Sequence, residues 1–201
     1  MTYIISTRQL TETVAPVADP ITLAEAKTHL RVDGTDSDTL ITAQITAARQ
    51  YIEKTIQRSM VQRTYRADVE GFAYRYRLPL PPLASISSIK YYTPDSPQVL
   101  TTLDANFYRA DLGRSEIYMD ASSASIPSIA SRHDAVQITF VAGHAPDTSS
   151  PIDHAANVPE AIKAATKLLV ADMYENRETS TPLKITQLPT VDRLLAAYRE
   201  Y

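Results

Sequence analysis

Cysteine and tryptophan are absent from this chain of 201 residues, and glycine occurs only 4 times. The lack of cysteine excludes disulfides, a thiol nucleophile and cysteine-based zinc or iron–sulfur centres. The few glycines form no GxGxxG or GxxxxGKS/T phosphate loop, and no serine lies in a GxSxG motif. The sequence therefore lacks the motifs of common nucleotide-binding enzymes and serine hydrolases, and we expect no catalytic residue and no cofactor.

Long hydrophobic runs and an excess of positive charge are also missing. The apolar stretch 164–173 is interrupted by polar and charged residues, so no segment is predicted to span a membrane. The first residues lack the basic region and long apolar run of a signal peptide. The net charge is −3, from 20 basic and 23 acidic residues, without the basic stripe typical of proteins that bind nucleic acid through its phosphates. We expect a soluble protein that is made inside the cell and does not bind duplex DNA directly.

The beginning of the chain divides into an arm and a helical region. Residues 1–19 show no helical period and are predicted to form an extended N-terminal arm. Residues 20–60 form a first helical region, where Thr22 and Glu25 have the spacing of a capping box and Gly34 can end the first helix. A second, longer helix is predicted from apolar residues spaced by three and four, namely Ile41, Ile45, Ala48, Ile52 and Ile56.

A β region follows. From Val61 the hydrophobic period changes from 3.6 to 2, and a cluster of prolines at 79–82 excludes helix there. Residues 61–150 are therefore predicted to form an antiparallel β insertion, with a serine-rich loop at 121–131. Its strands alternate tyrosine with arginine, as in the run Tyr74, Arg75, Tyr76 and Arg77. Tyrosine and arginine favour protein contacts, whereas stacking on single-stranded nucleic acid is the weaker alternative.

A second helical region covers residues 151–201. Its first helix, the third of the chain, begins near Pro159 and carries an apolar stripe of Ile162, Ala165, Leu169 and Met173. Further apolar residues widen this stripe, which indicates burial on two sides, against the same subunit and against a neighbour. We therefore predict that these stripe residues are contacts between subunits of a ring.

The chain ends in a short amphipathic segment. Residues 179–189 contain two prolines and are predicted to be an extended tether. The segment 190–201 carries an apolar stripe flanked by two arginines, and its residues are Val191, Arg193, Leu194, Leu195, Tyr198 and Arg199. A helix this short is marginal in water and needs a docking surface. That surface is either its own subunit or another protein.

One group of polar residues leaves a second function open, that of a metal-dependent hydrolase or nuclease accessory. Its candidate ligands lie before the third helix and are His144, Asp147, Asp153 and His154. No histidine has the HxxxH or HExxH spacing of a helical metal site. We therefore favour a protein without a bound metal.

Several segments occur in an order that is known from one family. Residues 20–33 read PITLAEAKTHLRVD, and residues 40–53 read LITAQITAARQYIE. Later segments are LPPL at 80–83, IKYY at 89–92, VQITFVAG at 136–143, VPEAI at 158–162 and LLAAYR at 194–199. Together they resemble head–tail connector (adaptor) proteins of long-tailed double-stranded DNA phages and of related gene transfer agents.

The resemblance implies a fold and a role. The fold is α+β, a helical bundle of two N-terminal and two C-terminal helices with the β insertion between helices 2 and 3. The role is a structural virion protein that forms a homo-oligomeric ring of about 12 subunits under the portal protein. Such a ring prolongs the DNA channel, without sequence-specific DNA binding, and receives a tail-side neck or tail-completion protein. The resemblance also favours docking of the terminal helix on the portal or a neighbouring subunit. Another neck or tail-completion protein remains an alternative.

Overall fold

The computed structural model describes residues 2–6, 9–119, 126–149, 151–176 and 189–199. The chain divides into two compact units. The helical unit comprises Val17–Val61 and His144–Tyr201, and the β unit comprises Met1–Pro16 and Gln62–Gly143. Among the residues that the structure describes, no helix is long and apolar enough to cross a membrane.

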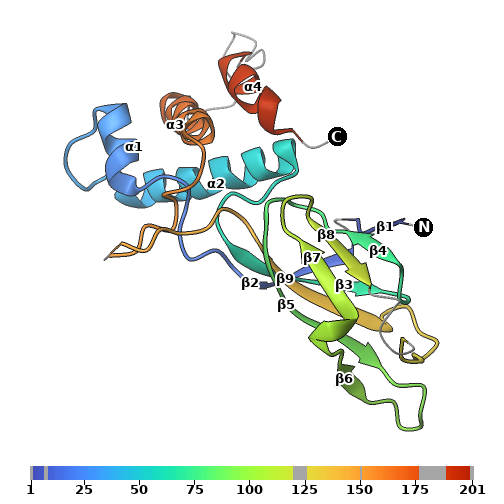
Figure 1. Cartoon of the computed structure of the whole chain (residues 1–201). Coiled ribbons are helices and arrows are strands. Elements are labelled where there is room, and N and C mark those ends of the chain that lie inside the picture. Colours follow the sequence, from blue (N-terminus) through green and yellow to red (C-terminus); the bar gives the residue numbers. More distant parts are fainter. Residues whose placement is uncertain (1, 7–8, 120–125, 150, 177–188, 200–201) are drawn as a thin grey trace. The chain divides into compact units, whose positions relative to one another are not determined.

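The helical unit is built from helices that come from both ends of its sequence (Figure 1). They are α1 (Leu23–Leu30), α2 (Asp38–Ile56), α3 (Glu160–Glu175) and α4 (Pro189–Leu195), which continues as a 3-10 turn over Ala196–Tyr198. The predicted capping box starts α1: the Glu25 amide donates to the Thr22 hydroxyl at 3.2 Å, and the Glu25 carboxylate accepts from the Thr22 amide at 2.8 Å. The left-handed residue that ends α1 is Arg31 (φ 55°), not Gly34 as the sequence suggested.

The core of the helical unit forms around one face of α2. The predicted stripe is confirmed, since Ile41, Ile45, Ala48, Ile52 and Ile56 are all at most 2% exposed. Contacts from α1, α3 and α4 close this core. The isoleucines of α2 therefore hold together helices that lie more than 100 residues apart in the sequence.

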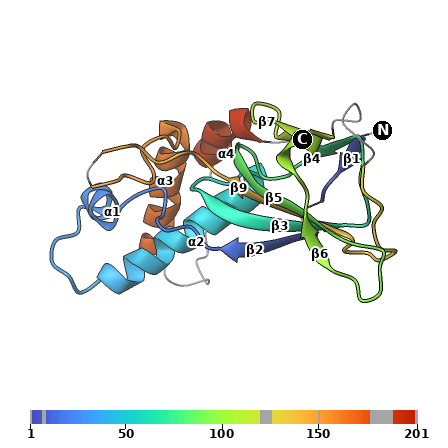
Figure 2. The same ribbon diagram turned by 60° about the horizontal axis from the view of Figure 1, so that its bottom comes forward.

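The β unit contains two sheets (Figure 2). The four-stranded sheet has the order β1 (Thr2–Ile4), β4 (Arg75–Arg77), β8 (Glu116–Met119), β7 (Tyr108–Asp111). The five-stranded sheet has the order β2 (Leu10–Val14), β3 (Arg63–Val69), β9 (Val136–Ala142), β5 (Leu83–Tyr92), β6 (Leu100–Thr102). The pairings are antiparallel except for β1 with β4, which is parallel. The α+β class is confirmed, and the sheet region is mixed rather than purely antiparallel.

The N-terminal segment supplies an edge strand to each sheet. In the four-stranded sheet, Tyr3 pairs with Tyr76. In the five-stranded sheet, β2 pairs with β3 and the register shifts between Glu12 and Val14. These two strands of the N-terminal segment bond to strands 50 or more residues away, because strand edges offer unpaired donors and acceptors.

Both sheets contribute to one core in the β unit. Tyr76, Ile117, Ile138 and Phe140 are fully buried and belong to the same apolar cluster. The Tyr76 hydroxyl donates to the Gly71 carbonyl at 2.6 Å, so this buried phenol keeps a polar partner. Burial raises the pKa of Tyr76. Tyr76 is therefore a core residue and is not available for the protein contact that the Tyr–Arg alternation suggested.

Candidate functional site

The α3 residues predicted to contact a neighbouring subunit lie in the core of the helical unit. Ile162 and Ala165 are fully buried, Leu169 is buried as well, and Met173 packs partly buried against the same cluster. The helices α1, α2 and α4 all contact α3 within one subunit. The breadth of the apolar stripe therefore reflects packing on several helices of the same chain, and these side chains do not form an open surface.

The terminal helix α4 also packs on its own subunit. Val191 and Leu195 are 4% and 0% exposed in the helical core, with Leu194 and Tyr198 partly buried beside them. Of the two docking surfaces considered from sequence, the subunit itself covers the apolar stripe. Arg193 is exposed at the surface of α4.

Arg199, the second flanking arginine of the stripe, pairs with a residue of α4 itself. Its guanidinium donates to the Asp192 carboxylate at 2.7 Å. The predicted tether lies outside the described residues, apart from Pro189 at the start of α4. On the predicted docking segment, Arg193 and Arg199 therefore reach the surface, whereas Val191 and Leu195 are buried in the helical core.

A buried ion network is the most distinctive polar feature of the helical unit. Arg49 of α2, with a side chain 9% exposed, donates to the Asp19 carboxylate at 2.6 Å and to the Glu53 carboxylate at 3.2 Å. Thr46 also donates to Asp19. Glu53 accepts from the Met60 amide at 2.9 Å through its other oxygen. Glu53 is itself buried, and its carboxylate links Arg49 to the chain beyond the helix.

This network holds residues near the ends of the two segments that make up the helical unit, Val17–Val61 and His144–Tyr201. Asp19 is held by Arg49, and Met60 is held by Glu53. The His144 amide donates to the Met60 carbonyl at 3.0 Å. Both segments of the helical unit are therefore tied, directly or through one residue, to the C-terminal half of α2.

Two of the residues considered as metal ligands, Asp147 and Asp153, accept backbone hydrogen bonds through their carboxylates. The Asp147 carboxylate accepts from the Asp153 amide at 2.8 Å and from the Ser149 amide at 3.3 Å, which caps a loop. Burial, and then the positive charge of Arg58, lowers the pKa of His144. A neighbouring cation also disfavours a bound metal there. Within the described ranges, no group of three or more histidine, aspartate or glutamate side chains could hold a metal ion.

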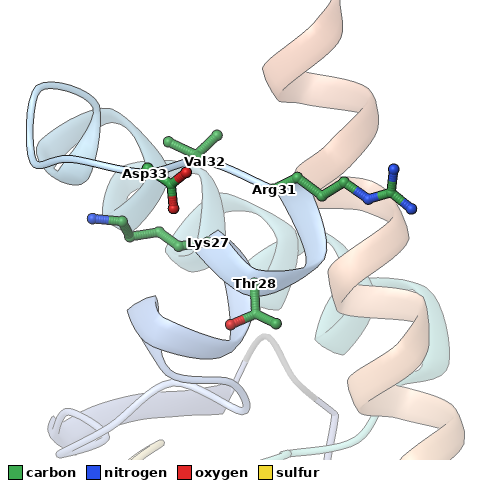
Figure 3. A pocket seen from close by; sticks show the side chains of 5 residues that line it. All are labelled: Lys27, Thr28, Arg31, Val32 and Asp33. Carbon is green, nitrogen blue, oxygen red and sulfur yellow. The ribbon is translucent and has the colours of Figure 1, made fainter.

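A shallow pocket lies at the end of α1 (Figure 3). Its volume is about 340 Å³ and its lining residues are Lys27, Thr28, Arg31, Val32 and Asp33. Lys27 donates to the Asp38 carboxylate at 2.6 Å and to the Gly34 carbonyl, so its ammonium group is occupied. Figure 3 shows Arg31 directed away from Lys27 and Asp33. The polar groups of the pocket do not converge on one point, and it lacks the features of a catalytic site.

The exposed face of α2 is a surface that the sequence pattern did not single out. Leu40 and Tyr51 are 39% and 57% exposed. Ala43 and Ala47 lie between them at helical spacing and are also exposed. Leu40, Ala43, Ala47 and Tyr51 are spaced by 3 to 4 residues in the sequence. This pattern is weaker than the isoleucine stripe on the opposite face of α2, so it did not stand out. The helical unit thus presents an extended, weakly apolar helix face.

A family model matches the first helical region. Residues 20–90 match the model described as "Phage gp6-like head-tail connector protein". This range covers α1, α2, β3, β4 and most of β5. The resemblance seen in the sequence is confirmed for this segment. The comparison with curated protein sequences gave no match.

Solved structures of gene transfer agent (GTA) particles have a similar fold. The chain is 22% identical to a chain of the "Neck of empty GTA particle computed with C6 symmetry", with a TM-score of 0.75 and coverage of 96% of this chain and 95% of that chain. A chain of the "Virion of native gene transfer agent (GTA) particle" is 23% identical, with a TM-score of 0.73 and coverage of 96% of this chain and 95% of that chain. A chain of the "Neck of native GTA particle computed with C12 symmetry" is 21% identical, with a TM-score of 0.73 and coverage of 96% of this chain and 95% of that chain. The fold is therefore shared along nearly the whole length of both chains.

Proposed function

We propose that this protein is a structural head–tail connector in the neck of a phage or gene transfer agent particle. The observation that carries the proposal is a double agreement: residues 20–90 match the connector family model, and 96% of the chain has the fold of a protein from a GTA neck. One comparison scores the sequence of residues 20–90, and the other scores the fold along nearly the whole chain. Both point to a structural protein of the particle, and we propose that it has no enzymatic activity.

The assembled form that we propose is a ring of about 12 copies, in line with the C12 symmetry named for one relative. The ring would lie under the portal protein, prolong the DNA channel and receive a tail-side neck or tail-completion protein. DNA would pass through it without base-specific contacts. The net charge of −3 supports passage rather than tight binding.

The two units would divide this work. We propose that the helices form one bundle. Residues 61–150 would be the β insertion between α2 and α3, and residues 1–19 would be the arm that completes the sheets. The helical unit would make the portal and ring contacts through its exposed surfaces, and the β unit would face outward or toward the tail. Arg193 and the Leu40–Tyr51 face of α2 are exposed, which supports this division.

Addition of the purified protein to DNA-filled heads that carry a portal tests the proposal. We expect monomers or weak oligomers in solution and a closed ring on the portal, measured by native mass spectrometry with and without portal protein. Arg193→Glu should weaken head attachment, whereas Arg193→Lys, which keeps the positive charge at the same position, serves as the matched control. A stable two-fold dimer at all concentrations, or no association with heads, would contradict the proposal.

Electron microscopy of assembled particles separates the connector from other neck proteins. Density for this fold directly beneath the portal is expected. Density at the far end of the neck or within the tail would instead support the alternative of a tail-completion protein.

A further inference from the structure

The exposed side of α2 carries no charge over about three turns. From residue 39 to residue 51, its exposed positions hold only threonine, leucine, alanine, glutamine and tyrosine. Arg49 is the one charged residue within this range, and it is buried. The solvent side of a surface helix is normally charged and polar, whereas few charges and an exposed tyrosine are typical of protein interfaces. The composition therefore indicates that another protein covers this side of α2.

The Leu40–Tyr51 face on this side of α2 consists of Leu40, Ala43, Ala47 and Tyr51. These residues follow one another at spacings of 3 and 4, so they are neighbours on the helix surface. Leu40 and Tyr51 are 39% and 57% exposed, and about 16 Å of helix separates them. Only methyl groups lie between these two larger side chains, which leaves room for one apolar side chain of a partner.

The helical unit also exposes a large apolar side chain on a loop that its own hydrogen bonds hold in place. Ile152 is 56% exposed. The Asp147 amide donates to the Asp153 carbonyl at 3.0 Å, and the Asp153 amide donates to the Asp147 carboxylate at 2.8 Å, which closes the loop. The Ser149 hydroxyl donates to the Pro151 carbonyl at 2.8 Å. An ordered loop loses less entropy on binding, so Ile152 is suited to anchor a protein contact.

The charges that border these two surfaces are opposite in sign. Lys54 is exposed and lies three residues beyond Tyr51 on the same side of α2. Asp153 is exposed and directly follows Ile152. Its carboxylate accepts from the Ala155 amide at 2.8 Å, which fixes the position of this negative charge beside the loop. One chain thus carries two apolar surfaces with complementary charges at their edges, and this arrangement favours a second copy of the chain as the partner.

We propose that Ile152 of one copy of this chain packs on the Leu40–Tyr51 face of the next copy. The inference rests on the proposed ring and names the surfaces that join neighbouring subunits. Asp153 of the first copy would then face Lys54 of the second. The contact is heterologous because the two surfaces differ, and repeated heterologous contacts close into a ring when their rotation allows it.

Cross-linking of introduced thiols tests the contact, because the chain has no cysteine of its own. Ala43→Cys places a thiol on the Leu40–Tyr51 face, and Thr148→Cys places one on the loop of Ile152; both positions are exposed. On portal-bearing heads, a short bis-maleimide should join copies of the double variant into a ladder of covalent multimers on a denaturing gel. Either single variant alone should give no dimer, because a heterologous contact does not bring identical positions together.

Arginine substitutions on two sides of α2 provide a second measurement. Ala47→Arg places a long charged side chain on the Leu40–Tyr51 face and should abolish ring formation on portal-bearing heads. Thr42→Arg, at an exposed position on another side of the helix, is the matched control and should assemble like the wild type. Ile152→Asp should abolish ring formation as Ala47→Arg does. Circular dichroism should show that all three variants are folded.

The outcomes separate this inference from the proposed function. Wild-type protein that forms no ring on heads contradicts the proposed function itself. With a wild-type ring, absence of the ladder from the assembled double variant overturns the inference, and so do dimers of a single variant or normal rings of Ala47→Arg. Covalent products with the portal protein in place of the ladder would assign the Leu40–Tyr51 face to that partner and would overturn the inference too.

Discussion

The two units hold the N-terminal segment by the same type of contact, but the surroundings of the contact differ. In the β unit, the buried Arg63 pairs with Glu12 at 3.1 Å, and the Glu12 carboxylate is 39% exposed. In the helical unit, Arg49 pairs with Asp19 and with Glu53, whose side chains are 24% and 11% exposed. A carboxylate with little access to water, such as Glu53, is costlier to separate from its arginine than one that remains hydrated, such as Glu12. We therefore expect the ion pairs of Arg49 in the helical unit to contribute more to stability than the ion pair between Arg63 and Glu12 in the β unit.

Replacement of these arginines should give the largest effect. Arg49→Met removes the guanidinium that Asp19 and Glu53 share, and we expect a loss of about 3–5 kcal/mol in the free energy of unfolding. Arg63→Met should destabilise the protein less, since Glu12 can turn to solvent. Denaturant unfolding monitored by circular dichroism measures both. Equal losses for the two variants would show that the exposure of the partner carboxylates does not determine how much each ion pair contributes to the free energy of unfolding.

The next effect concerns the core of one unit. Leu195→Ala removes a fully buried side chain of α4 and should destabilise the helical unit by about 3 kcal/mol. Ile138→Ala should do the same in the β unit. Hydrogen exchange, followed separately for the two units, should show that each variant loosens mainly its own unit. The surface change Arg193→Ala is the control for α4. If Leu195→Ala has no effect on stability, α4 does not contribute to the core.

A smaller effect is expected at the start of α1. Thr22→Ala removes the capping box and should cost about 1 kcal/mol of stability. Thr42→Ala, at an exposed position inside α2, replaces the same residue type without a helix cap and should be close to neutral. Thermal unfolding of the pair provides the measurement. A larger loss for Thr42→Ala would mean that the cap does not stabilise α1.

The smallest effect depends on pH. The pKa of His144 is lowered in the folded protein, so the unfolded chain binds the proton more readily. Stability is therefore complete above about pH 6.5 and falls as the pH decreases toward the folded pKa. His144→Gln should flatten this region of the profile, and His133→Gln, at a side chain 89% exposed, should leave it unchanged. An identical profile for wild type and His144→Gln would contradict the assignment.

The sequence predicted best those features that depend on neighbours within a few residues. The isoleucine stripe of α2 and the Thr22 cap follow from helical spacing alone, and both are confirmed. The connector resemblance was equally visible, because it depends on short segments. Such patterns identify the apolar face of a helix without naming what covers it.

Features that depend on distant partners were harder to predict. The apolar faces of α3 and α4 could be covered by their own subunit or by another, and only the packing of Leu169 and Leu195 shows that it is their own. The burial of Glu53 could not be predicted either, since it requires Arg49 and the Met60 amide to meet in space. The burial of Tyr76 likewise requires the register of β4 with β8.

The interleaving of the two units has a consequence for synthesis on the ribosome. The β unit has all its strands once residue 142 has emerged, whereas α1 and α2 still lack α3 and α4 at that stage. The isoleucine face of α2 therefore stays uncovered while residues 144–195 are translated. At about 5–20 residues per second this takes several seconds. The helices that are made first should thus be the last to reach their native environment, and the nascent chain should be most prone to aggregation just before α3 emerges.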